Sequence, residues 1–514
     1  MNREEMIRRV EEGHIWDFII IGGGATGLGT AVEAASRGYK TLLLEQSDFA
    51  KGTSSRSTKL VHGGVRYLKQ GNLSLVLEAL KERGILRRNA PHLVHDLPFI
   101  VPNYDWWEGP FYGIGLKLYD ALAGKEGFGR SELLTKDETL KHIPTIEQKG
   151  LRGGVIYYDG QFDDARLSIN MAETAYEQGA ALLNYMPVIG IIKDRETVNG
   201  VRALDIETGK EYALGAKVVI NATGVFTDSI RKMDDPESKN IILSSQGVHI
   251  VLKKSFLPGD SAIMVPETDD GRVLFAIPWR DHVLVGTTDT PVSEYPLEPV
   301  PFKEEIDFLV SHAARYLSKD PSHKDILSAF AGLRPLVKSG EDENTAAISR
   351  DHTINISRSG LLSITGGKWT TYRKMAEDTV DQAIMLAHLD FQESVTTELR
   401  IHGYHSYAEE FDDLSIYGSD AIAIQELLEK EKSFKERLHP QFPIQKGEVI
   451  WSVRNEMART VEDFLARRTR LLLKDARASI ETALPVAEIM AKELNKNSKW
   501  VNDQVKEFTA IAGN

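Results

Sequence analysis

The chain has 514 residues, enough for two or three domains, because one hydrophobic core rarely grows beyond roughly 250–300 residues. With 42% hydrophobic and 27% charged residues it has the composition of an ordinary globular protein, and no apolar run approaches the ~18 residues of a membrane-spanning helix. Cysteine is absent, which excludes disulfides, thiolate catalysis and iron–sulfur clusters, and we expect no metal site. The net charge of −13 argues against a nucleic-acid partner, and we expect a cytoplasmic protein.

The first predicted unit is a strand, a glycine-rich turn, a helix and a second strand. Residues 15–21 form an apolar run typical of a buried parallel strand, a helical pattern covers 25–37, and a strand at 40–44 ends on Glu45. In such a unit the helix N-terminus binds phosphates and the terminal acid binds ribose hydroxyls. We therefore predict a dinucleotide-binding turn rather than a glycine-rich loop without a ligand. Its predicted contacts are Gly22, Gly24, Ala25, Thr26, Gly27 and Glu45.

Three later segments favour FAD over NAD as the cofactor. A strand at 217–221 ends in Ala222-Thr223-Gly224, which is typical of flavoproteins whose nucleotide domain returns to the cofactor. A hairpin around residues 208–210 precedes that strand. A Gly-Gly-Lys segment at 366–368 leads into a predicted helix at 370–388, whose N-terminal dipole can stabilise a reduced flavin. Since the chain has no second G-x-G-x-x-G array, we expect FAD alone and no NAD(P)H domain.

A series of segments in chain order resembles the FAD-dependent glycerol-3-phosphate dehydrogenases. The resemblance begins with Thr-Ser-Ser-Arg-Ser-Thr-Lys-Leu-Val-His-Gly-Gly-Val-Arg-Tyr-Leu at 53–68 and includes Gly-Gly-Lys-Trp-Thr-Thr-Tyr-Arg-Lys at 366–374. The other segments are 164–167, 247–251, 286–289, 332–336, 349–351 and 454–463. Two positions depart from the pattern: Ser-Gln-Gly-Val precedes His249 where many bacterial relatives carry a lysine, and His352 stands where they often have tyrosine. These departures affect substrate contacts rather than the reaction.

The resemblance implies oxidation of sn-glycerol 3-phosphate to dihydroxyacetone phosphate by hydride transfer to FAD, with electrons passed to a membrane quinone. The nearest alternative is a glycerol-3-phosphate oxidase that uses oxygen, although the chain leaves no room for the insertion that such oxidases usually carry. Wider alternatives are another FAD-dependent oxidase of the same fold and an FAD-binding sensor without redox activity. A homodimer is compatible with the sequence.

The resemblance also implies the site residues. Arginine suits a phosphate because its planar guanidinium donates bidentate hydrogen bonds, although any single arginine can instead form a surface ion pair. Predicted catalytic residues are Arg334, Lys368, His62 and Arg66. Predicted substrate contacts are Arg66, Arg334, Arg350, Tyr67 and Thr288. Further predicted cofactor contacts are Thr53, Ser54, Ser57, His62, Gly64, Thr223, Gly224, Gly367 and Lys368. His249 is a weaker candidate for the base, and for either histidine a structural hydrogen bond is the alternative role.

A membrane face is expected because electrons must leave without a second nucleotide site. Aromatic residues cluster at 106–112, as they do at bilayer interfaces, and 75–93 has an amphipathic helical pattern with Lys81, Arg83, Arg87 and Arg88. We expect these segments to hold the protein peripherally on the anionic cytoplasmic face of the cell membrane. The alternative is that the aromatic residues pack beneath the substrate domain.

We expect an α/β fold with a two-dinucleotide-binding (Rossmann-like) FAD domain, a mixed-sheet substrate domain and a C-terminal helical domain. The FAD domain is expected at 14–70, 150–235 and 355–390, the substrate domain at 71–149 and 236–354, and the helical domain at 391–514. Strands are expected at 273–278 and 282–286. Helical spacing predicts core packing for Met457, Val461, Phe464 and Leu465. A solvated face, or else a partner or membrane contact, is predicted for Arg467, Arg468, Arg470, Lys474 and Arg477.

Overall fold

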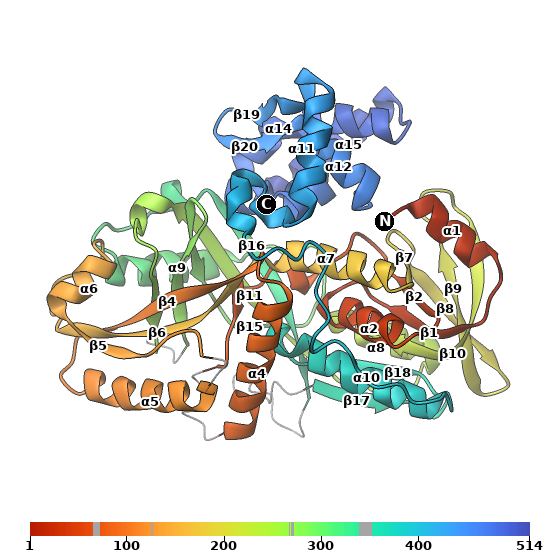
Figure 1. Ribbon diagram of the computed structural model, residues 1–514, viewed down its shortest axis with the longest axis horizontal. Helices are drawn as coiled ribbons and strands as arrows, with labels where there is room; N and C mark the ends of the chain where they lie inside the picture. Colours follow the sequence, from red (N-terminus) through yellow and green to blue (C-terminus); the bar gives the residue numbers. More distant parts are fainter. Residues whose placement is uncertain (65–71, 125–126, 267, 269–271, 339–351, 514) are drawn as a thin grey trace.

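Two β-sheets lie side by side, and the C-terminal helices lie against both of them (Figure 1). The computed structural model describes residues 1–64, 72–124, 127–266, 268, 272–338 and 352–513. Three predicted site residues, Arg66, Tyr67 and Arg350, lie outside this part of the chain, so their roles stay predictions. Among the described helices, none has the length and hydropathy that crossing a bilayer requires.

The first sheet has 8 strands, with the order β17-β18-β10-β1-β2-β7 and a hairpin extension of β8 and β9 on β10. The central strands β18, β10, β1, β2 and β7 run parallel, whereas β17 is antiparallel to β18. The bounds are β1 Trp16–Ile21, β2 Thr41–Leu44, β7 Ala181–Leu183, β8 Val188–Asp194, β9 Thr197–Leu204, β10 Glu211–Asn221, β17 His352–Ile356 and β18 Leu362–Gly366. The predicted hairpin around 208–210 is confirmed as the antiparallel β9–β10 pair.

Apolar residues run through β1 without alternation because helices cover the parallel sheet. Phe18, Ile19 and Ile20 have no exposed surface. The helices α2 (Ala25–Ser36), α7 (Asp164–Glu177) and α10 (Tyr372–Leu386) pack together beside this sheet, and α1 (Arg3–Glu11) contacts β7. The helices predicted at 25–37 and 370–388 are thus confirmed, apart from their terminal residues.

The second sheet has 10 strands and is mixed, as predicted. β12 is parallel to β4, whereas β6 pairs with β4, and β16 with β11, in antiparallel ladders. The bounds are β3 Leu60–Val61, β4 Val94–Asn103, β5 Glu132–Thr135, β6 Gly153–Phe162, β11 Ile242–Lys253, β12 Ala262–Val265, β13 Leu274–Trp279, β14 His282–Gly286, β15 Thr290–Val292 and β16 Ser328–Val337. The strands predicted at 273–278 and 282–286 are confirmed as β13 and β14.

Helices α4 (Leu73–Asn89), α5 (Glu108–Ala123), α6 (Lys136–His142) and α9 (Lys303–Tyr316) flank the second sheet (Figure 1). The sequence predicted exposed basic residues on α4, and Lys81, Arg87 and Arg88 are exposed. For Arg83 the prediction is wrong. Its guanidinium is buried 2.5 Å from Asp159 and lies over the Phe128 ring, because an ion pair and an aromatic face compensate for the loss of water.

The C-terminal part is mainly helical, as predicted. Its elements are α11 Asp420–Lys430, α12 Lys446–Asn455, α13 Leu471–Lys474, α14 Ala476–Glu493 and α15 Ser498–Ala512, with a short hairpin of β19 Arg437–His439 and β20 Phe442–Gln445 and a π-helix at Asp463–Arg468. The predicted core packing is confirmed, because Met457, Val461, Phe464 and Leu465 are buried. The predicted fold class is therefore confirmed in all three of its parts.

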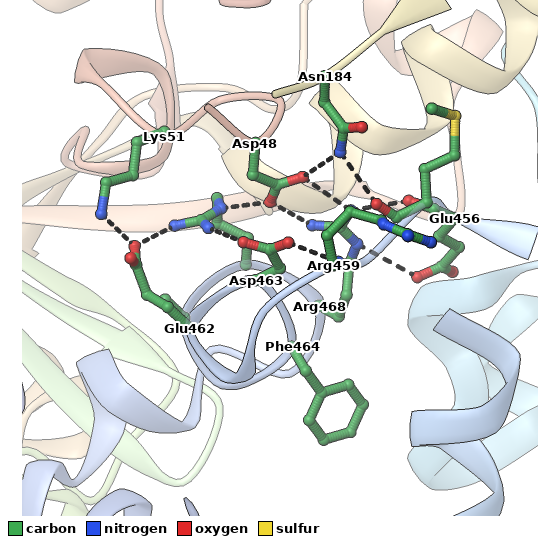
Figure 2. A network of polar contacts seen from close by, with 12 residues as sticks. Asp48, Lys51, Asn184, Glu456, Arg459, Glu462, Asp463, Phe464 and Arg468 are labelled. Atoms are coloured by element: carbon green, nitrogen blue, oxygen red, sulfur yellow. Dashed lines mark hydrogen bonds and ion pairs between the residues drawn. The ribbon is translucent and has the colours of Figure 1, made fainter. Parts of the chain in front are cut away.

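The basic run after residue 466 is not a solvated face, which corrects the prediction from sequence. Arg467, Arg468, Arg470 and Lys474 are buried, and only Arg477 of the five is exposed. Figure 2 shows part of the network, in which Arg468 pairs with Asp48, a buried residue that follows β2 in the chain. Buried arginines persist because each one is paired with a carboxylate. The run therefore attaches the C-terminal helices to the rest of the chain.

Candidate active site

A cavity of about 480 Å³ lies beyond the carboxyl ends of β1, β10 and β18 and extends to the second sheet. Ligands of open α/β sheets bind beyond the carboxyl ends of the strands, so this is the expected place for a dinucleotide. Most of the predicted site residues line it: Gly22, Gly24, Ala25, Thr26, Glu45, Thr53, Ser54, Ser57, His62, Thr223, Gly224, Arg334, Gly367 and Lys368.

The glycine-rich turn between β1 and α2 leaves no space for side chains. A Cβ on Gly22, whose φ is +110°, would lie 2.7 Å from the carbonyl oxygen of Ala222, and a Cβ on Gly27 would lie 1.8 Å from that of Gly22. Gly24 is the N-cap residue of α2 and has no side chain to cap the helix. Apart from the Ala25 N–H, which donates to Ser54 Oγ, the N–H groups of the first helical turn and the glycine backbone suit a pyrophosphate.

The acid at the end of the second strand has an additional structural role. Glu45 Oε2 accepts from the Gly23 N–H at 2.6 Å, and Oε1 accepts from the Ser47 N–H at 2.9 Å. Burial raises the pKa of Glu45, and the two backbone donors oppose that rise. The carboxylate is thus fixed at the cavity wall, where a ribose hydroxyl can donate to it.

Residues 53–58 form a cofactor-facing loop that connects the parts of the cavity. The Ser54 Oγ accepts from the Ala25 N–H at 2.9 Å, and the Ser54 carbonyl accepts from the Trp369 indole N–H at 2.9 Å. Thr53 donates through its hydroxyl to the Leu333 carbonyl at 2.5 Å. The Ser57 hydroxyl donates its hydrogen to Asp164 at 2.7 Å, so toward a cofactor this oxygen can act only as an acceptor. The loop therefore joins the nucleotide turn to β16 and to the segment after β18.

Glycines also leave the backbone exposed to the cavity at the ends of β10 and β18. Gly224 follows β10 with a φ of +59°, and at the end of β18 Gly366 and the next residue, Gly367, have φ values of +78° and +77°. A Cβ on Gly367 would lie 2.3 Å from the Met375 sulfur. These bare segments, the acid and the phosphate-binding turn fit a flavin dinucleotide. Gly64 is buried with a φ of +75° but does not line the cavity, so its predicted cofactor contact stays a prediction.

The end of the cavity at the second sheet is cationic. Arg334 donates through Nη2 to Thr287 Oγ1 at 3.1 Å and to the Thr288 carbonyl at 3.0 Å, and through Nη1 to Ser245 Oγ at 3.1 Å. Its Nη1 also lies 3.3 Å from Asp289. The guanidinium is therefore oriented by the sheet. Lys368 approaches the same cavity from the segment after β18.

The Thr288 side chain is directed away from the cavity. It has no exposed surface, its hydroxyl donates to Glu305 at 2.9 Å, and it accepts from the Val248 N–H at 2.9 Å. The predicted substrate contact through this hydroxyl is therefore corrected to a supporting role, since only the Thr288 carbonyl reaches Arg334. Sequence spacing does not show the burial of a hydroxyl against a distant glutamate.

Of the two candidate histidines, His249 has the environment of a neutral base. It stacks on Phe330 with a centroid distance of 5.1 Å, and its Nε2 lies 2.9 Å from Thr58 Oγ1. Burial, reinforced by the positive charges of Lys59 and Arg334, holds the pKa of His249 well below its ordinary value. His62 also lines the cavity, and its backbone N–H donates to Thr370 Oγ1 at 3.2 Å.

Several residues of this region were not predicted from the sequence. Arg56 lines the cavity and pairs with Glu298 at 2.5 Å, and Ser245 and Asp289 orient Arg334. Asp164, Lys59 and Arg470 lie behind the loop at 53–58. Four of these, Arg56, Lys59, Asp164 and Asp289, stand in segments that resemble the dehydrogenase family, and that resemblance was their only signal in the sequence. The sequence context of Arg470 was misleading, because this residue belongs to the basic run that was predicted to be a solvated face.

Comparisons with known proteins agree with this geometry. Residues 17–373 match the family model described as FAD dependent oxidoreductase, and residues 362–501 match the model described as C-terminal domain of alpha-glycerophosphate oxidase. The chain is 41% identical over 540 residues to the mitochondrial glycerol-3-phosphate dehydrogenase of Homo sapiens, covering 98% of this chain and 74% of the relative. It is 38% identical over 580 residues to that of Schizosaccharomyces pombe, covering 100% and 89%.

One solved structure is similar over nearly the whole chain. The glycerol-3-phosphate dehydrogenase from Bacillus halodurans, complexed with FAD, superimposes with a TM-score of 0.82 at 31% identity. The likeness covers 99% of this chain and 97% of that structure. Since this similarity includes the C-terminal helices, both proteins have the same arrangement of two sheets and a helical part.

Proposed function

Because the chain belongs to the FAD-dependent glycerol-3-phosphate dehydrogenase family, we propose that it oxidises sn-glycerol 3-phosphate to dihydroxyacetone phosphate. It is an FAD-dependent oxidoreductase with FAD as its cofactor. The observation that carries the substrate proposal is that Arg334 and Lys368 both line the cavity that contains the phosphate-binding turn. Two cations in a dinucleotide-binding cavity suit a small phosphorylated substrate.

Each residue of the cavity has its own role in the proposed reaction. FAD, when bound, supplies the acceptor for the hydride that leaves carbon 2 of the substrate. Arg334 binds the phosphate, since the sheet presents its guanidinium edge in a fixed orientation. His62 or His249, both of which line the cavity, takes the proton of the substrate hydroxyl; His249 is neutral, but its low pKa makes it a weak base. Lys368 stabilises negative charge at the reacting oxygen or the flavin edge, and Arg66, Tyr67 and Arg350 complete the substrate contacts.

We further propose that the electrons pass to a membrane quinone and that α5 holds the protein on the cytoplasmic face of the membrane. The support is an exposed apolar surface on and beside α5. The alternative expectation was that its aromatic residues pack beneath the substrate domain. Trp106 is 77% exposed and Ile114 is 73% exposed. The other exposed members of this α5 surface are Trp107, Phe111, Leu118 and Leu133. Such an exposed aromatic and aliphatic patch is typical of an interaction surface, and tryptophan suits a bilayer interface.

The domain division also stays a proposal, in a form modified by the strand pairing. We propose that 14–59, 163–235 and 352–390 make the FAD domain, and that β3 and β6 belong with the substrate domain. The support is that β3 and β6 pair in the second sheet, whereas the expected division assigned them to the first. The helical domain keeps its expected bounds of 391–514.

A steady-state assay of the purified holoenzyme tests the function and the acceptor together. With sn-glycerol 3-phosphate we expect dihydroxyacetone phosphate to form while a soluble quinone analogue is reduced and little hydrogen peroxide appears. Peroxide formed in proportion to product without any quinone would favour the oxidase alternative. The absence of product with every acceptor would overturn the proposed substrate.

A further inference from the structure

The cofactor-facing loop is fixed from behind by buried charges, one of which comes from the C-terminal helices. The Ser55 carbonyl oxygen accepts from Arg470 Nη2 at 2.8 Å and from Lys59 Nζ at 2.9 Å. Asp164 joins the same two cations, with Oδ1 2.8 Å from Arg470 Nη2 and Oδ2 2.7 Å from Lys59 Nζ. Lys59, Asp164 and Arg470 all have no exposed surface. Their charges therefore interact without competition from water.

The front of the same loop contacts three separate parts of the cavity. Ser54 binds the N–H of Ala25 at the nucleotide turn and the indole of Trp369 after β18. Thr58 lies 2.9 Å from His249. Because Ser55 lies within this short loop, a displacement of its carbonyl would move the contacts to the nucleotide turn, the Trp369 segment and the histidine together. The loop is thus held on one side by Arg470 and used on the other by the cofactor site.

The chain just before Arg470 is anchored by buried polar contacts. Arg470 follows the π-helix Asp463–Arg468, in which Arg468 lies 2.6 Å from Asp48 and donates to the Glu456 carbonyl at 2.7 Å, as Figure 2 shows. Its backbone is left-handed, with a φ of +66°, a conformation that costs a non-glycine residue about 1–2 kcal/mol. A strained arginine persists where its side-chain contacts offset the strain. The position therefore requires both the left-handed turn and the long charged side chain.

We propose that Arg470 is a positioning residue. Acting through the Ser55 carbonyl and Asp164, it holds the cofactor-facing loop in the conformation that binds FAD and aligns it for hydride transfer. The C-terminal helices thereby complete the back wall of the cofactor site. The inference on turnover rests on the proposed function, whereas the inference on FAD binding does not.

The proposal has a specific kinetic signature. Arg334 is oriented by Ser245, Thr287 and Thr288 of the second sheet rather than by Arg470. Loss of Arg470 is therefore expected to lower kcat and weaken FAD binding while leaving the KM for the phosphorylated substrate nearly unchanged. A general loss of stability would instead reduce the amount of folded holoenzyme without changing turnover per bound flavin.

The experiment compares Arg470→Met and Arg470→Lys with a matched control, Arg166→Met. Arg166 is a similarly buried arginine on α7 that pairs with Glu456 at 2.5 Å and does not line the cavity. Both sites join α7 to the C-terminal part, so both methionine variants lose a buried ion pair there. The readouts are the Kd for FAD added to the apoprotein, the visible spectrum of the bound flavin, and kcat and KM per bound flavin.

We expect Arg470→Met to lower turnover per bound flavin by roughly 10- to 100-fold, as small misplacements of reacting groups do, and to raise the Kd for FAD and shift the flavin spectrum. Arg470→Lys, which keeps the charge and the donor, should restore much of the loss and serves if the methionine variant does not fold. Arg166→Met should stay within about twofold of wild type in turnover. Wild-type FAD affinity, spectrum and turnover in Arg470→Met, or equal losses in Arg166→Met, would overturn the proposal. If the wild type itself fails to oxidise sn-glycerol 3-phosphate, the substrate proposal falls, and FAD affinity and spectrum still decide the role of Arg470.

Discussion

The guanidinium of Arg334 donates to the backbone carbonyl of Thr288 at 3.0 Å, so a main-chain acceptor orients the cation that faces the substrate end of the cavity. The side-chain hydroxyls of Ser245 and Thr287 also accept hydrogen bonds from this guanidinium. Acceptors at both terminal nitrogens, Nη1 and Nη2, fix the orientation of the guanidinium in the cavity wall. That preorganisation favours a phosphate over a flexible surface ion pair.

Replacing Arg334 by methionine should therefore weaken substrate binding. A charged hydrogen bond contributes about 1.5–3 kcal/mol, so we expect kcat/KM for sn-glycerol 3-phosphate to fall by roughly 10- to 100-fold, mostly through a higher KM. Initial rates over a range of substrate concentrations measure this. Arg477→Met removes an exposed arginine and should leave the kinetics unchanged. An unaltered KM in Arg334→Met would assign the phosphate to other residues.

Gly27→Ala should abolish FAD binding. The new Cβ would lie 1.8 Å from the Gly22 carbonyl oxygen, a backbone atom that cannot move without opening the phosphate-binding turn. The flavin content of the purified protein, from its visible absorption, checks this. The control is Gly115→Ala in α5, where a Cβ meets nothing within 4 Å. A full complement of FAD in Gly27→Ala would show that the turn does not hold the cofactor as described.

His402 should make the protein less stable as the pH rises. Burial alone would lower the pKa of His402, but hydrogen bonds to Asp420 and Glu177 and the charge of Glu173 raise it to about 11. Since the folded state holds the proton more tightly than the unfolded state, the stabilisation is fully present below pH 6.5 and is lost as the pH rises toward about 11. The loss amounts to at most about 1.4 kcal/mol per pH unit.

Urea unfolding at about pH 7 and about pH 9 measures this dependence. The free energy of unfolding of the wild type should fall between the two, and His402→Gln should show a clearly smaller fall. His323→Gln changes an exposed histidine and should keep the wild-type dependence. Parallel pH dependences in wild type and His402→Gln would rule out a proton held by this histidine.

Ile114→Asp should weaken membrane association. Ile114 is 73% exposed on the α5 surface, and a carboxylate there would have to enter an apolar and anionic interface. Flotation with vesicles of phosphatidylcholine and phosphatidylglycerol tests this: the wild type should float and the variant should remain in the soluble fraction. Ile422→Asp changes an isoleucine of α11 that is 51% exposed, on the part of the molecule far from α5, and should float like the wild type (Figure 1). Equal flotation of Ile114→Asp would place the contact elsewhere.

Local patterns were sufficient to predict much of the fold and of the cofactor site. The strand, turn and helix around Gly22 and Gly24 depend on neighbours in sequence, so periodicity and glycine spacing identify them. Arg468 shows the limit. It pairs with Asp48, 420 residues away, and no local pattern distinguishes a buried paired arginine from a solvated one. Arg83 and Thr288 were misjudged for the same reason, since their partners Asp159 and Glu305 are distant in sequence and meet them only in the folded protein.

The most direct test of the account is anaerobic mixing of the purified holoenzyme with sn-glycerol 3-phosphate while the visible absorption of the bound flavin is recorded. We expect the oxidised flavin band to disappear and dihydroxyacetone phosphate to form in an amount equal to the bound FAD, whereas unphosphorylated glycerol leaves the flavin oxidised. A flavin that stays oxidised with sn-glycerol 3-phosphate, or that is reduced equally well by glycerol, would contradict the role assigned to the cationic end of the cavity.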